Sequence, residues 1–173
     1  MFFKAKTQAT DELAGPGWLE RLPREAASLA CLGLSLFLLI LLASFSPNDP
    51  GWSSSGDGGP INNLVGRFGA WLADALLSLF GYVAFLLPWA VLQSGIRILR
   101  PALGPVLLLP RSLRWAAWLV LLGSLSALCA MHVGGSTEWG PQGSGGILGS
   151  ALSDALIAVL SPVGATLLLL TLL

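Results

Sequence analysis

Charged residues are scarce in this sequence, and their scarcity excludes an ordinary soluble domain. Only 10% of the 173 residues are charged and 54% are hydrophobic, and the mean hydropathy is +0.77. Soluble domains carry about 25% charged residues, so this composition indicates helices that cross a membrane. The formal net charge is zero, so no overall basic field favours nucleic acid as a direct partner.

Several kinds of chemical site are also missing. The two cysteines, Cys31 and Cys129, lie in predicted spans at depths that differ by ~14 Å from the helical rise, which is too far for a disulfide. The one histidine, His132, has no second ligand nearby, so we expect no metal site. No GxxxxGK[ST] loop occurs, so we expect no nucleotide cofactor and no enzyme activity in this segment.

Four long apolar runs predict an all-α membrane protein. The predicted spans cover residues 26–45, 72–96, 115–133 and 149–173. Pro88 is expected to kink the second span, and Ser161-Pro162 interrupts the fourth. Apolar residues at helical spacing predict a short amphipathic helix at the membrane interface before the second span: Ile61, Leu64, Val65, Phe68, Trp71 and Leu72.

The order of residues in the first half of the chain returns in the second half. Trp52 precedes Gly56, Gly58 and Gly59 at the spacings that Trp139 keeps from Gly143, Gly145 and Gly146. A carboxylate, Asp74 or Asp154, then follows in each half. Such self-similarity predicts one structural unit used twice, here two repeated helical hairpins. The glycines are best explained as turns at positive φ, since neither loop has the lysine of a phosphate loop.

The distribution of basic residues predicts the topology. All nine Lys and Arg residues except Arg67 lie before the first span or between the second and third. The positive-inside rule then places the tail 1–24 and the loop 97–114 in the cytoplasm, and the loops 46–71 and 134–148 outside. Four arginines set this orientation and are expected to touch anionic lipid: Arg97, Arg100, Arg111 and Arg114. Four spans return the C-terminus to the cytoplasm, where the leucine-rich end of the sequence predicts that a longer parent chain continues.

Four residues are candidates for a functional site. Asp74 and Asp154 are carboxylates within apolar segments, where ionisable groups usually serve a function. The alternative is that each stabilises the N-terminal end of its helix through the helix dipole. Trp52 and Trp139 are either anchors at the membrane interface or contacts for a partner outside the membrane.

These features resemble the N-terminal membrane domain of the FtsK family of septal DNA translocases. The resemblance covers residues 21–173 and depends most on three motifs: Ser46-Pro47-Asn48-Asp49-Pro50-Gly51-Trp52-Ser53, Gly56-Asp57-Gly58-Gly59-Pro60-Ile61-Asn62-Asn63, and Gly69-Ala70-Trp71-Leu72-Ala73-Asp74 followed by Phe80-Gly81-Tyr82. It implies a multi-pass protein of the bacterial inner membrane at the division septum, in which this segment anchors the translocase and contacts other division proteins and lipids.

The same resemblance implies parts that this sequence lacks. Members carry a cytoplasmic linker and a C-terminal motor that binds ATP, Mg²⁺ and DNA and couples chromosome partition to cell division. A homo-oligomer, with a hexamer suspected, is implied as well. The competing hypothesis is a small transporter or channel subunit built from parallel repeats, which would place polar groups and broken helices near the centre of the bilayer. Predicted breaks at Gly81 and at Ser161-Pro162 give it weak support, but the polar groups within the spans are only scattered serines.

Overall fold

Residues 17–99, 111–133 and 141–173 are described by the computed structural model, and within these ranges the chain is helical with no strand. The elements in order are α2 (Gly17–Ala43), α3 (Gly66–Phe80), the 3₁₀ helix η1 (Gly81–Phe85), α4 (Leu86–Leu99), α5 (Arg111–His132) and α6 (Gly146–Leu172). Four segments are long and apolar enough to cross a membrane: Leu22–Ala43, Gly66–Leu99, Leu113–His132 and Gly146–Leu172. The chain is therefore an all-α protein with four candidate spans.

The first helix is longer than its apolar run. α2 begins at Gly17, well before the predicted start of the first span at residue 26, and ends at Ala43. Pro23 consequently lies in the interior of α2 and not in its first turn. The added residues are the polar approach to the span, which forms helix although hydropathy marks only the part that suits lipid.

The predicted second span is two helices with a break between them. α3 ends at Phe80, η1 covers Gly81–Phe85, and α4 resumes at Leu86. The predicted break at Gly81 is confirmed, whereas the kink expected at Pro88 is wrong, because the irregular backbone ends before that proline. Pro88 lies in the first turn of α4, where its missing N–H leaves no helical hydrogen bond unmade, so the irregular backbone precedes the proline.

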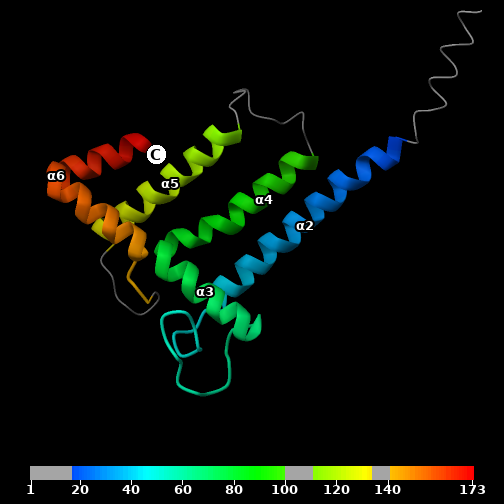
Figure 1. Ribbon diagram of the computed structural model, residues 1–173, viewed down its shortest axis with the longest axis horizontal. Coiled ribbons are helices and arrows are strands. Elements are labelled where there is room, and N and C mark those ends of the chain that lie inside the picture. Colours follow the sequence, from blue (N-terminus) through cyan, green and yellow to red (C-terminus); the bar gives the residue numbers. More distant parts are fainter. Residues whose placement is uncertain (1–16, 100–110, 134–140) are drawn as a thin grey trace, which may run out of the picture.

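The first of these two helices, α3, corresponds to the predicted interfacial helix. It runs across the ends of α2 and α4, which lie side by side (Figure 1). Helix begins at Gly66 and not at Ile61. Its buried face carries Asp74 and small or medium residues, whereas Phe68 and Trp71 are exposed. A helix that points large apolar side chains away from the protein suits the surface of a bilayer.

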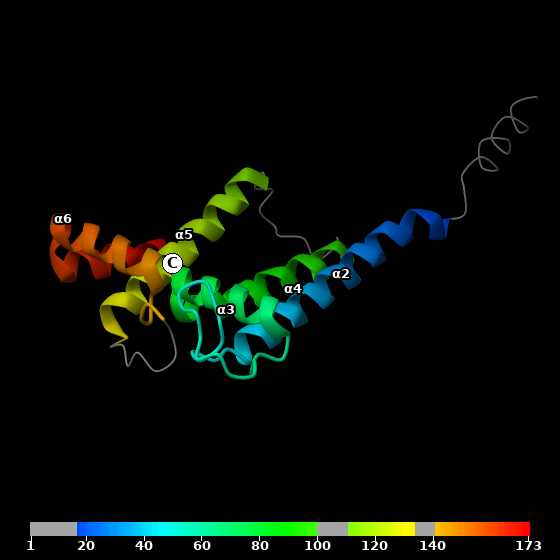
Figure 2. The same cartoon turned by 60° about the horizontal axis from the view of Figure 1, so that its bottom comes forward.

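The predicted interruption at Ser161-Pro162 is confirmed by a break in α6. Ser161 has φ 63° and ψ 164°, an extended ψ that the following proline favours combined with a φ that is strained for a serine. Figures 1 and 2 show the second half of α6 turning back toward α5. Asp74 precedes Gly81, and Asp154 precedes Ser161, by the same seven positions (81 − 74 and 161 − 154), although the prediction of repeated hairpins itself stays a prediction.

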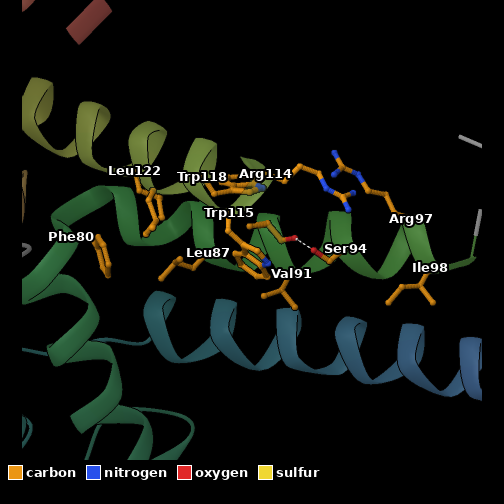
Figure 3. A pocket seen from close by; sticks show the side chains of 12 residues that line it. Phe80, Leu87, Val91, Ser94, Arg97, Ile98, Arg114, Trp115, Trp118 and Leu122 are labelled. Carbon is orange, nitrogen blue, oxygen red and sulfur yellow. Dashed lines mark hydrogen bonds between the residues drawn. The ribbon is translucent and has the colours of Figure 1, made fainter. Parts of the chain in front are cut away.

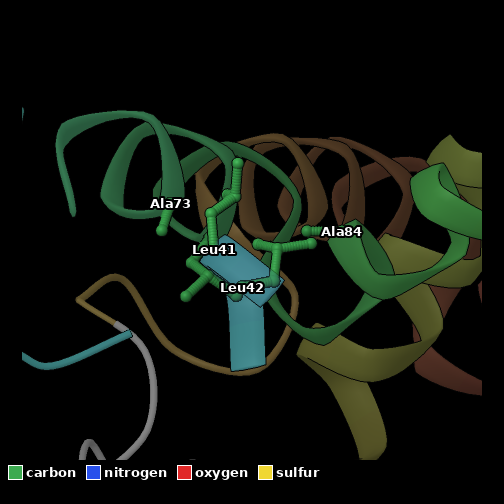
Figure 4. Close-up of a cluster of buried hydrophobic side chains, with 5 residues drawn as sticks. Leu41, Leu42, Ala73 and Ala84 are labelled. Atoms are coloured by element: carbon green, nitrogen blue, oxygen red, sulfur yellow. The ribbon is translucent and has the colours of Figure 1, made fainter. Parts of the chain in front are cut away.

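The main hydrophobic core joins α2 to α3 and η1. Its buried members come from the end of α2 and from the helices that cross it (Figure 4): Leu41, Leu42, Ala73, Leu77 and Ala84. Two leucines packed against two alanines bring the helix backbones close together, as is usual for helix contacts in membranes. This core fixes the start of the second helical segment on the end of the first.

The helices form two pairs that meet at one junction. α2 packs on α4, and α5 packs on α6, but no Cα atoms of α4 and α5 come within 8 Å of one another along their described lengths. At the junction the Ser126 hydroxyl donates to the Phe80 carbonyl (2.9 Å), and the Tyr82 N–H donates to the Ser144 carbonyl (2.9 Å). The single hydroxyl hydrogen of Ser144 is shared between two carbonyls near the end of α5, those of Cys129 (2.8 Å) and Val133 (2.7 Å). The two helical pairs are therefore joined by hydrogen bonds at the junction and diverge from it.

Candidate functional site

The loop between α2 and α3, residues 44–65, is called the first loop, and a buried carboxylate closes it. Asp49 accepts hydrogen bonds from the backbone N–H groups of Asn62 and Asn63, both at 2.8 Å, and from the Asn62 amide at 3.3 Å. Only 4% of Asp49 is exposed. Charge-assisted hydrogen bonds to a carboxylate are about twice as strong as neutral ones, so Asp49 holds the start of the first loop against its end.

Asn63 attaches the closed loop to the helices on both sides. Its side-chain amide donates to the carbonyls of Leu41 (2.9 Å) and Ser44 (3.2 Å). These lie at the end of α2, where carbonyls lack helical partners. The Asn63 side-chain oxygen accepts from the Val65 N–H at 3.0 Å, just before α3 begins. One buried side chain therefore ends α2 and sets the start of α3.

Asp74, a predicted site residue, is the second carboxylate that holds the first loop by hydrogen bonds. Its carboxylate accepts from the Ser53 N–H (2.5 Å) and the Ser53 hydroxyl (2.9 Å), and it is 4% exposed. It lies about two turns into α3, beyond the first turn where the helix dipole acts. Gly51 is required beside it, because a Cβ there would overlap the Asp74 side chain. The carboxylate contacts the chain's own loop and is not itself open to a partner.

Trp52 is the exposed residue of the first loop that lies beside the Asp74 contacts. It lies between Gly51 and Ser53, the two residues that contact Asp74, and half of its surface, 50%, is exposed. Further large apolar side chains are exposed at the end of the loop and on α3: Ile61, Leu64, Phe68 and Trp71. The described residues of this region form an exposed, partly apolar surface and no arrangement of nucleophile and base.

The other predicted site residues are placed differently. Asp154 is exposed on α6 and accepts no hydrogen bond from the described part of the chain. Trp139 and Arg100 lie outside the described residues, and Arg111 is described only as the first residue of α5. Arg97 and Arg114 line a cavity between α4 and α5 (Figure 3). No group of three or more potential metal ligands occurs in ranges 17–99, 111–133 and 141–173.

Sequence reasoning missed the carboxylate and amides that close the loop. Asp49, Asn62 and Asn63 enter the sequence analysis only as members of the family motifs, with no role of their own. A signal was present, since a carboxylate after a helix end and two asparagines before the next helix are groups that hydrogen-bond to nearby backbone. Their mutual contact joins residues 13 and 14 positions apart, which no local pattern specifies.

Comparisons with known proteins agree on one family. The model for the 4TM region of DNA translocase FtsK/SpoIIIE matches residues 20–173. A DNA translocase FtsK from Shewanella oneidensis is 36% identical over 148 residues, which covers 84% of this chain. DNA translocase FtsK 2 from Ralstonia nicotianae is 33% identical over 174 residues and covers 95%. In DNA translocase FtsK from Vibrio vulnificus the identity rises to 56% over 54 residues, 31% of this chain.

The chain spans less than a quarter of the curated relatives that it matches, namely 16% of the Shewanella protein and 22% of the Ralstonia protein. No solved structure matches the chain. The similarity is thus to the membrane region of much longer proteins.

Proposed function

Because the chain belongs to the family of the 4TM region of DNA translocase FtsK/SpoIIIE, we propose that it anchors a translocase at the division septum and that its first loop binds other division-site membrane proteins. The observation that carries the proposal is the fixed presentation of Trp52. Exposed tryptophans on a preorganised surface are the side chains most often found to dominate protein interfaces, and a loop held by Asp49 and Asp74 loses little entropy on binding.

The remaining activity of the relatives is assigned to the part of the protein outside this chain. We place ATP hydrolysis, Mg²⁺ and DNA pumping there, because the sequence lacks the lysine and Ser/Thr of a nucleotide loop. The membrane segment then acts as an anchor that couples division to chromosome segregation. A hexameric assembly, with cytoplasmic N- and C-termini, follows from the same proposal.

The helix breaks at Gly81–Phe85 and at Ser161 favour the transporter hypothesis. In transporters, broken helices surround a polar site near the centre of the bilayer. Here the break at Gly81 instead packs against the backbone of Ser144 and Gly145, and the cavity beside Phe80 is lined mainly by apolar side chains. Anchoring is therefore the better-supported function.

Replacing Trp52 by alanine is the direct test of the binding surface. We expect the recovery of crosslinked division-site membrane proteins from dividing cells to fall at least tenfold, because loss of a dominant interface residue costs about 2 kcal/mol or more. Trp89→Ala is the matched control, since Trp89 is 54% exposed but lies on α4, away from the first loop. Equal recovery for wild type and Trp52→Ala, at equal membrane insertion, would leave Trp52 as a lipid anchor only.

A further inference from the structure

The gap between the two helical pairs is a groove, defined here as the space between α4 and α5. It has a volume of about 830 Å³, within the range of ~300–1,000 Å³ for binding sites of small molecules. It begins near Phe80 and Leu122 and extends to Arg97 and Arg114 (Figure 3). No Cα atom of α4 lies within 8 Å of a Cα atom of α5 along their described lengths, so the two helix backbones leave this space between them.

The groove is apolar along its length and basic at one end. Leu87, Val91, Leu119 and Leu122 form its apolar part. At the far end Arg97 from α4 and Arg114 from α5 point toward one another (Figure 3), with Trp115 and Trp118 beside Arg114. Tryptophan and arginine together are typical of the depth of lipid headgroups. The groove therefore joins an acyl-chain environment to a headgroup environment.

The two guanidinium groups lack a counter-charge in the groove. No carboxylate is among the described residues that line it, and the nearest ends of α4 and α5 both carry positive charge. Two cations that converge repel one another, so an anion between them is favoured. Arginine binds phosphate through paired hydrogen bonds, and a phosphodiester with an attached hydrocarbon chain matches both ends of the groove.

We propose that an anionic phospholipid occupies the groove, with its phosphate between Arg97 and Arg114 and an acyl chain along α4 and α5. A helix of a partner protein would fill the apolar part but would leave the two guanidinium groups without an anion unless it carried a carboxylate at that depth. A phospholipid supplies the anion and the chain in one molecule. The bound lipid would hold the splayed pairs at a fixed separation, since it touches both.

Lipid retention in nanodiscs with equal amounts of phosphatidylglycerol and phosphatidylcholine tests this proposal. After release from the nanodisc into native mass spectrometry, the chain is expected to retain phosphatidylglycerol over phosphatidylcholine by roughly thirtyfold, given the usual contribution of two basic residues near an anionic lipid. The double variant Arg97→Gln/Arg114→Gln should lose that preference. Arg97→Lys/Arg114→Lys should keep most of it, which separates loss of charge from misfolding.

The matched control is Arg67→Gln, which removes an exposed arginine at the start of α3, far from the groove. It should leave the preference unchanged, and an equal loss in this variant would overturn the proposal. Phosphatidylglycerol with a photoactivatable acyl chain should crosslink to Val91 or Trp118, whereas absence of crosslinks there would contradict the proposal. Displacement of the lipid by glycerol phosphate alone would show a free-phosphate site and would equally contradict it.

Discussion

Replacing Gly81 by alanine is expected to destabilise the protein by about 4 kcal/mol, combining ~1–3 kcal/mol of backbone strain with ~1–3 kcal/mol of overpacking. Gly81 has φ 60°, which a residue with a Cβ rarely adopts. A Cβ there would also overlap the backbone carbonyl of Ser144. Backbone atoms have no alternative rotamer, so the junction must separate for the methyl group to fit.

Thermal unfolding of the purified chain in detergent measures this effect, with Gly123→Ala as control. Gly123 lies on α5, where a Cβ would meet only the Leu152 Cδ2 atom at 3.6 Å, an ordinary van der Waals contact. We expect a large fall in the unfolding temperature for Gly81→Ala and almost none for Gly123→Ala. Equal unfolding temperatures for Gly81→Ala and wild type would refute the packing at the junction.

Replacing Asp49 by alanine is expected to release the first loop. The substitution leaves the partly buried N–H of Asn62 and the buried N–H of Asn63 without their acceptor, and an unsatisfied buried polar group costs ~1–3 kcal/mol. With a loss of about 3 kcal/mol, the open population of the loop rises about a hundredfold. Cleavage by chymotrypsin at Trp52 should accelerate by a similar factor, since proteolysis of a locally opened segment follows that population.

Asp57→Ala is the control for this second variant. Asp57 lies in the same loop and carries the same charge, but its side chain is exposed, and only its backbone N–H is bonded, to the Asn48 carbonyl. Its cleavage rate should stay within about twofold of wild type, as is usual for surface substitutions away from buried contacts. Equal acceleration in both variants would mean that loss of charge, and not loss of the buried acceptor, loosens the loop.

The sequence predicts the helices well because their signals are local. Leucine-rich runs mark the four spans, Gly81 marks the first break, and Ser161-Pro162 marks the second. The kink expected at Pro88 is wrong, and the sequence does not predict the close approach of Gly81 to Ser144. That approach depends on how the two helical pairs meet, which is information that neither segment contains by itself.

The roles of the two aspartates show the same limit. Asp74 and Asp154 have similar neighbours in the sequence. However, Asp74 is buried and accepts hydrogen bonds from Ser53, whereas Asp154 is exposed. The sequence predicts the same role for both aspartates, because it does not show that the first loop lies over α3. The sequence likewise predicts no role for Asp49, because its hydrogen-bond partners at residues 62 and 63 lie close to it only after the loop has folded.

Access to the first loop from outside the cell tests the central claim most directly. Ser54 is exposed in the first loop, and Leu99 is exposed at the arginine-bearing end of α4. In a background with Cys31→Ala and Cys129→Ala, a membrane-impermeant maleimide should label Ser54→Cys from outside the inner membrane and Leu99→Cys only after permeabilisation. Labelling of Ser54→Cys from the cytoplasmic side alone would contradict both the orientation and the docking function proposed for the loop.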